Sequence, residues 1–329
     1  MGINRILANL RQQHLSARSD RVDTLPEINR RIEQGAFGWT TRQTTSAERP
    51  LREQVGLIGG VSVREREAAN QIRETSQAER AAPRFQRGPM VDWRNHNGNN
   101  YITRAWNQKQ CNACISFSLV GAMEANLRIQ TGRPNLPVAL SEASLNFCRQ
   151  GGRGNCHSGW GATAALEWAK NQGGTDEECT PWGAQRCNYC RNWQQRAIKI
   201  ASYAEHRTTE ERKAAVERGP CIAYMFIYSD FLSYGGGIYR KTPGSRALGY
   251  HSVVIIGYND HQRCWIIKNS MGRSWGEDGC GLVGYGDVEL MIDNAFPFYS
   301  IGQLIVPPFY RTHRTGSGDK LTDLTSIYS

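Results

Sequence analysis

The chain has 329 residues, 39% of them hydrophobic, with a formal net charge of +10. This length allows one large domain with an appendage, or two domains, and the composition supports a sizeable core. Because the basic residues are scattered and no apolar run approaches a membrane span, we expect neither a nucleic-acid partner nor membrane insertion. The first eleven residues lack the apolar core of a secretory signal.

Residues 1–88 differ in composition from the rest, since they contain 15 Arg but no Lys and no Cys. So weakly hydrophobic a segment is not expected to fold by itself. Two interpretations stay open: an N-terminal prosegment that covers an active site until it is removed, or a flexible extension. Within it we predict helices over 3–14, 26–34 and 63–81, and loops over 40–48 and 56–60.

A polar loop over 107–113 leads directly into a predicted helix. The apolar positions Ile115, Leu119, Met123 and Leu127 have helical spacing, and Thr131-Gly132 ends the run. Cys114 therefore sits at the helix N-terminus, where the unpaired N–H groups and the macrodipole favour a thiolate, the nucleophilic form of the side chain. The alternative is that Cys114 is one more cross-linked cysteine among ten.

Two later segments help to decide whether Cys114 is a nucleophile or a cross-linked cysteine. His251 stands at the head of an apolar, β-branched strand, and Asn269 follows a second such strand in an Asn-Ser-x-Gly turn. A Cys, a His and an Asn in this order, far apart in sequence, are typical of a nucleophile, a base and the residue that orients the base. On these residues the chain resembles the papain-like cysteine peptidases over about residues 89–310.

The resemblance implies a two-lobed α+β fold with a helical left lobe and a β-barrel right lobe. The domains expected are an N-terminal prosegment or extension over 1–88, a peptidase domain over 89–311 and a polar tail over 312–329. Elements predicted within the peptidase domain are helices over 162–172 and 208–218, and strands over 221–227, 251–258, 264–269 and 280–285.

The resemblance also implies the site and the reaction. Cys114 would be the nucleophile, His251 the acid and base, and Asn269 the orienting residue. The Gln108 amide and the Cys114 backbone N–H would form the oxyanion hole. The chain would be a hydrolase, a thiol endopeptidase acting on polypeptides through an acyl-thioester, made as a zymogen. Substrate-binding residues implied by position are Gly159, Trp160, Tyr224, Ser252 and Trp275.

Two positions depart from the family pattern, since Ile115 and Met271 stand where the family has Trp. The second Trp normally shields the Asn–His hydrogen bond, and Met could retain part of this shielding. One alternative is therefore a catalytically weakened binding protein with the same fold. Another is a zinc-binding structural module, built from the CxxC pairs 111–114 and 187–190. The main hypothesis, a papain-like cysteine peptidase, needs no metal or cofactor and predicts a monomer.

All ten cysteines lie at or after position 111, in clusters typical of a disulfide framework and an oxidising compartment. We therefore expect a secreted or otherwise extracytoplasmic protein, exported without a classical signal peptide. By resemblance, the disulfides would be Cys111–Cys156, Cys148–Cys187 and Cys179–Cys190. Cys264 and Cys280, on neighbouring predicted strands, could form a fourth and leave Cys221 as a buried thiol.

Overall fold

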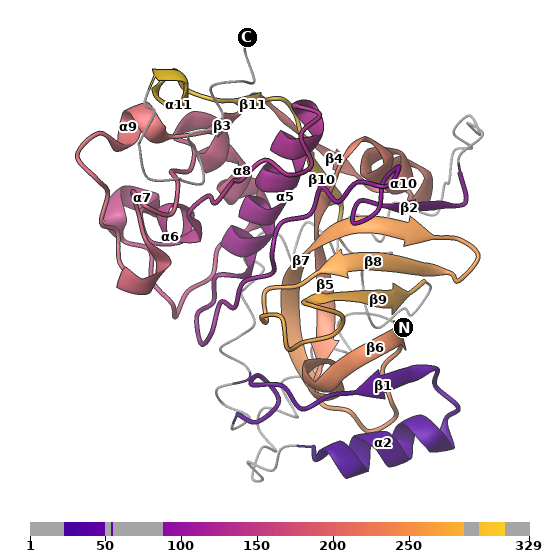
Figure 1. Cartoon of the computed structure of the whole chain (residues 1–329). Helices are drawn as coiled ribbons and strands as arrows, with labels where there is room; N and C mark the ends of the chain where they lie inside the picture. Colours follow the sequence, from indigo (N-terminus) through magenta and orange to yellow (C-terminus); the bar gives the residue numbers. More distant parts are fainter. Residues whose placement is uncertain (1–22, 50–53, 55–87, 286–295, 313–329) are drawn as a thin grey trace.

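The computed structural model of the chain describes residues 23–49, 54, 88–285 and 296–312. Helices and strands gather in two lobes that lie beside each other (Figure 1). This arrangement confirms the predicted two-lobed α+β fold. The helical lobe contains α6 (Glu142–Asn146), α7 (Arg149–Gly152), α8 (Ala162–Asn171), η1 (Trp182–Ala184), α9 (Trp193–Arg196) and α11 (Phe309–Thr312), with the two-stranded sheet of β3 (Lys199–Ile200) and β11 (Leu304–Ile305).

The β lobe is built on a nine-stranded sheet in the order β1-β6-β9-β8-β7-β5-β10-β4, in which β1 spans Trp39–Thr41 and β2 is paired to β7. β5 is buried at every position, as expected from its continuous apolar run. The predicted strands over 221–227, 251–258, 264–269 and 280–285 are confirmed, and α10 (Thr209–Arg218) confirms the predicted helix. The remaining bounds are β2 (Met90–Asp92), β4 (Tyr203–His206), β5 (Cys221–Tyr228), η2 (Ser229–Ser233), β6 (Tyr234–Tyr239), β7 (Ala247–Asn259), β8 (Cys264–Lys268), β9 (Cys280–Gly284) and β10 (Phe298–Ile301).

Helix α5 (Cys114–Gln130) is the element that both lobes share. It packs against α6 and α8 of the helical lobe and against β5 and β7 of the sheet (Figure 1). Every residue from Cys114 to Leu127 is buried, as expected of a helix enclosed on all sides. Its end is also as predicted, because Gly132 follows with a positive φ of 64°. The position of Cys114 is therefore fixed from both lobes.

The N-terminal segment contributes α2 (Leu25–Gln34) and β1 (Trp39–Thr41). α2 confirms the predicted helix over 26–34, and the Thr24 N–H donates to the Glu27 carboxylate at 2.9 Å at its start. The predicted loop over 40–48 is wrong at its first two residues, because they lie in β1, which pairs with the distant strand β6. The helices predicted over 3–14 and 63–81, the loop over 56–60 and the tail from 313 lie outside the described residues.

Glycines in β6 allow β1 to approach closely. Gly237 has φ +81°, and a Cβ built there would lie 2.3 Å from the Gly38 carbonyl oxygen. A Cβ on Gly235 would lie 2.8 Å from the Thr41 carbonyl carbon. Any larger residue at either position would therefore push β1 away from the sheet.

The three predicted disulfides, Cys111–Cys156, Cys148–Cys187 and Cys179–Cys190, are confirmed. The suggested pairing of Cys264 with Cys280 is wrong. In the β8–β9 ladder Cys264 lies opposite Gly284 and Cys280 opposite Lys268, so the two cysteines are four positions apart along the strands, or roughly 13 Å. A disulfide needs Cα atoms within about 7 Å. Cys221 is a buried thiol, as predicted.

Candidate active site

Cys114 is the first residue of α5, and its side chain is fully buried. The disulfide between Cys111 and Cys156 anchors the loop before it. Asn112 adds two bonds, from its backbone N–H to the Cys156 carbonyl at 3.0 Å and from its side chain to the His157 carbonyl at 2.9 Å. The loop therefore enters the helix along a fixed path, with the thiol at the positive end of the helix dipole.

His251 and Asn269 form a buried hydrogen-bonded pair. His251 lies within β7 and Asn269 directly follows the neighbouring strand β8, so the pairing of the two strands brings the side chains together. The Nε2 atom of His251 lies 2.8 Å from the Oδ1 atom of Asn269. Burial lowers the pKa of His251 to about 4, and the bond to Asn269 acts in the opposite direction. The other ring nitrogen, Nδ1, is buried without a hydrogen-bond partner among the described residues.

Gln108 connects the loop before the thiol to the turn that carries Asn269. Its backbone N–H donates to the Ser270 carbonyl at 2.9 Å, and its Oε1 accepts from the Ser270 hydroxyl. Its Nε2 donates to the Cys111 carbonyl at 2.8 Å. The side chain is fully buried and its plane is fixed from both ends.

A hydrogen bond between two serines holds the thiol-bearing helix against the strand that carries His251. The hydroxyls of Ser118 on α5 and Ser252 on β7 lie 2.7 Å apart, and both are buried. Ser118 follows Cys114 by about one helical turn and Ser252 is the neighbour of His251, so this contact fixes the thiol-bearing turn beside the imidazole-bearing strand.

The two residues that depart from the family pattern are both buried. Ile115 is 2% exposed in the main core, and Met271 is 1% exposed. Met271 pairs through its backbone with Asn107, directly before Gln108. An apolar side chain thus remains beside the turn of Asn269, although its contact area is smaller than that of a Trp.

The predicted substrate-binding residues divide into two groups. Gly159 and Trp160 are partly exposed, and the Trp160 indole N–H donates at 3.2 Å to the hydroxyl of Ser116, two residues after the thiol. Tyr224, Ser252 and Trp275 are at most 1% exposed, and each has its polar atom bonded inside the protein. The assignment of all five residues to substrate binding stays a prediction.

Three serines that connect the segments of this region were not predicted from the sequence: Ser116, Ser118 and Ser270. Ser118 carried a usable signal, because residues four apart lie on the same helix face and it stands at that distance from Cys114. Ser270 also carried one, since it belongs to the same turn as Asn269. Ser116 carried none, because its partner Trp160 is distant in sequence.

The zinc-module alternative is wrong, because Cys111, Cys187 and Cys190 are consumed by disulfides. In the part of the chain that the structure describes, no three His, Cys, Asp or Glu side chains form a metal-binding group. None of the described helices is both long and apolar enough to cross a membrane.

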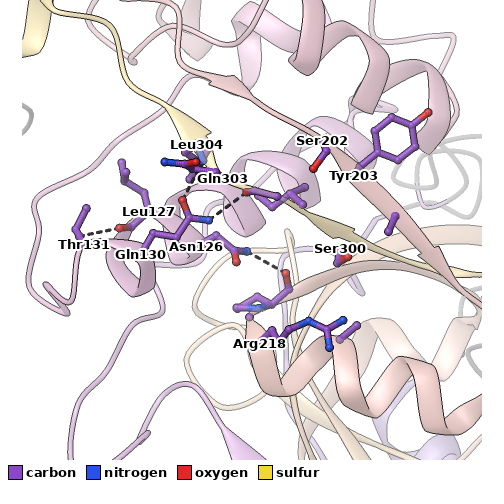
Figure 2. A pocket seen from close by; sticks show the side chains of 16 residues that line it. Asn126, Leu127, Gln130, Thr131, Ser202, Tyr203, Arg218, Ser300, Gln303 and Leu304 are labelled. Carbon is purple, nitrogen blue, oxygen red and sulfur yellow. Dashed lines mark hydrogen bonds between the residues drawn. The ribbon is translucent and has the colours of Figure 1, made fainter.

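A cavity of about 690 Å³ lies apart from the candidate site, and none of the predicted site residues lines it. It is bounded by the C-terminal ends of α5 and α10 and by the segment joining β10 to β11. Figure 2 shows Asn126 and Gln130 bridging the elements around it, where Gln130 donates to the Gly302 carbonyl at 3.1 Å. Arg218, at its edge, is exposed.

The thiol of Cys114 lies at the head of a helix that both lobes share, and the neighbouring strand carries a His that is hydrogen-bonded to an Asn. This is the arrangement of a cysteine protease domain. A family model described as papain family cysteine protease matches residues 88–295. The chain belongs to this family.

Two curated relatives are cathepsins. The chain is 32% identical to cathepsin K of Mus musculus over 203 residues, which covers 60% of each chain. It is 33% identical to cathepsin L2 of Homo sapiens over 201 residues, covering 57% of this chain and 58% of the relative. The chain thus spans about 60% of the length of the curated relatives that it matches.

Solved structures with the same fold include two proenzymes. Digestive procathepsin L 3 of Tenebrio molitor larval midgut matches with a TM-score of 0.65 and 23% identity, over 85% of this chain and 88% of the other. Procathepsin B S9 from Trypanosoma congolense matches with a TM-score of 0.66 and 19% identity, over 85% of this chain and 98% of the other.

Proposed function

We propose that the protein is a thiol endopeptidase that hydrolyses polypeptides through an acyl-thioester on Cys114. One observation carries the proposal: the 2.8 Å hydrogen bond between His251 and Asn269. The strand of His251 is held against the helix of Cys114 by the hydrogen bond between Ser118 and Ser252. This bond orients the imidazole so that its Nδ1 atom serves the thiol.

The first step forms the nucleophile. The Cys114 thiol transfers its proton to Nδ1 of His251, while the Nε2–H donates to Oδ1 of Asn269. Burial alone disfavours a charged imidazole, as the lowered pKa of His251 indicates. The adjacent thiolate and the Asn269 acceptor offset this effect, because both favour the protonated ring.

The thiolate sulfur then bonds to the carbonyl carbon of the scissile peptide, and the carbonyl electrons move to its oxygen. The Cys114 backbone N–H and the Gln108 side-chain amide donate to this oxyanion. The rigid bonding of Gln108 to Ser270 and Cys111 supports this role, because a donor that is already oriented needs no reorganisation during the reaction.

The tetrahedral intermediate collapses when the His251 imidazolium gives its proton to the departing amine and the C–N bond breaks. A water molecule then gives a proton to His251 and attacks the thioester carbonyl. This releases the carboxylic acid and restores the thiol. The backbone of Gly159 pairs with the substrate chain, while Trp160, Tyr224 and Ser252 bound the pocket for the residue two before the cleaved bond. Trp275 supports the same cleft.

Residues 1–88 act as a self-inhibitory prosegment of the 89–311 peptidase domain. The support is the way that β1 docks on β6, with Trp39 buried beside Tyr239 at a ring distance of 5.1 Å. The Thr44 hydroxyl donates at 2.6 Å to the Leu232 carbonyl and extends this contact. The enzyme acts as a monomer, and residues 312–329 are a polar tail.

Three disulfides are typical of proteins that work in an oxidising compartment. We place the enzyme outside the cytoplasm, as a secreted or otherwise exported protein.

Hydrolysis of a fluorescently labelled, unfolded protein tests this function. The full chain, a chain that begins at Pro89, and the Cys114→Ala variant of each are compared, with Cys221→Ala as the matched loss of a buried thiol. The short form should be active, its Cys114→Ala variant inactive and Cys221→Ala unaffected. Equal activity of long and short forms would refute the self-inhibition, while inactivity of every folded form would favour a binding protein.

A further inference from the structure

A cavity of about 10 Å³ lies beside Asn269, between the two lobes. A space of this size accommodates one water molecule when polar groups face it. The polar residues that line it come from four elements and the turn after β8: Ser118 on α5, Glu142 on α6, Ser252 on β7, Lys268 on β8, and Asn269 and Ser270 in the turn.

The Asn269 amide is satisfied on its oxygen side but not on its nitrogen side. Oδ1 accepts from His251 and, at 2.8 Å, from the backbone N–H of Ser270. Nδ2 is buried and has no hydrogen-bond partner among the described residues. Because a buried N–H group without an acceptor is costly, this nitrogen indicates an acceptor in the cavity.

Two buried ionisable groups border the same cavity. Glu142 and Lys268 are each 6% exposed. Burial raises the pKa of Glu142 well above its usual range, the neighbouring carboxylates of Glu124 and Glu177 add to this effect, and Lys268 opposes it. Protonated or not, the Glu142 carboxyl keeps an oxygen that can accept a hydrogen bond.

Lys268 also has a defined orientation. Its Nζ atom lies 2.8 Å from the hydroxyl of Thr103, which in turn donates to the Glu124 carboxylate at 2.5 Å. This chain holds the ammonium group at the border of the cavity, where it carries further N–H donors. A water molecule there would meet a donor, a carboxyl acceptor and the Asn269 amide.

We propose that one water molecule in this cavity accepts a hydrogen bond from Asn269 Nδ2 and donates one to Glu142, which makes Glu142 a positioning residue for the catalytic pair. The inference rests on the proposed peptidase function. A Glu142 oxygen can accept one hydrogen bond from the water, which leaves the water a lone pair for the N–H group of Asn269. The amide is thereby held with its oxygen toward His251, because a flipped amide would place its N–H against the Nε2–H.

The experiment follows alkylation of Cys114 in the full chain by iodoacetamide, measured by mass spectrometry between pH 4 and 9. Glu142→Gln retains an acceptor and should react within about twofold of the wild-type rate. Glu142→Leu removes the acceptor and should lower the rate below pH 7 about tenfold. The rise of the alkylation rate should move to higher pH, because His251 loses its protonated form more readily and then stabilises the Cys114 thiolate less. Glu177→Leu, which removes a partly buried carboxyl away from the cavity, should leave the profile unchanged.

A crystal structure of the wild-type chain at better than about 1.5 Å resolution completes the test. The proposal predicts an ordered water within about 3.2 Å of both Asn269 Nδ2 and a Glu142 oxygen. A dry cavity, or an alkylation profile that Glu142→Leu leaves unchanged, would overturn it. A wild-type Cys114 whose alkylation rises with pH only where that of an ordinary thiol does would instead overturn the peptidase proposal, while the crystal structure would still decide whether the water is present.

Discussion

Replacing Trp39 by Ala should release the N-terminal segment from the β lobe. Trp39 is 2% exposed, and its ring centroid lies 5.1 Å from that of Tyr239 and 6.3 Å from that of Tyr234. Truncating a buried aromatic residue costs about 3–5 kcal/mol. We expect about 3 kcal/mol, because water can fill the vacated site at the edge of the sheet. At about 1.4 kcal/mol per factor of ten, the undocked population rises roughly a hundredfold.

The assay is the rate at which a peptidyl epoxide labels Cys114 in the full chain, since such a reagent needs an uncovered cleft. Trp39→Ala should be labelled much faster than the wild type. Thr40→Ala is the matched control, because Thr40 lies on the same strand with an exposed side chain and should change nothing. If folded Trp39→Ala is labelled no faster than this control, the segment does not regulate the site through β1.

Three further predictions concern the candidate active site and the disulfide beside it. Asn269→Ala should lower kcat about 10–100-fold with little change in KM, because it removes the acceptor at 2.8 Å from His251; an unchanged kcat would contradict its role. In a Cys114→Ala background, the pKa of His251 is lowered to about 4 in the folded state, so the unfolded state binds more protons than the folded state between pH 6.5 and about 4. The contribution of His251 to the free energy of unfolding should therefore fall by about 3 kcal/mol as the pH falls through this range. Urea unfolding at each pH measures this, and His251→Gln in the same background should remove about 3 kcal/mol of the dependence. The Cys111→Ala/Cys156→Ala double variant lacks the disulfide and should lower the free energy of unfolding by about 2–4 kcal/mol, as measured by thermal unfolding. Peptide mapping that finds both cysteines as thiols in the oxidised wild type would contradict this disulfide.

The elements of the peptidase domain were predictable because their signals are local. The run from Ile115 to Leu127 has helical spacing with a Gly beyond its end, β5 is an unbroken apolar run, and β7 and β8 are rich in β-branched residues. The His251–Asn269 contact was predictable only through the resemblance, since no local pattern reveals which strands become neighbours.

The wrong predictions concern places where contacts between segments distant in sequence decide the structure. β1 is a strand because it pairs with β6, and its own sequence, Trp-Thr-Thr, is too short to show this. Cys264 and Cys280 lie on neighbouring strands, but their separation depends on a register that the sequence pattern does not contain. The partner of Ser118 likewise depends on long-range packing, because Ser252 lies on a strand that is distant in sequence.

The most direct test of the account is the mass of the chain that begins at Pro89 after incubation with a peptidyl epoxide, with the modified residue located by peptide mapping. The account predicts a single adduct on Cys114, absent from Cys114→Ala and retained in Cys221→Ala. A folded chain that gains no adduct, or gains it on a thiol other than Cys114, would contradict the claim that Cys114 is the nucleophile of a peptidase.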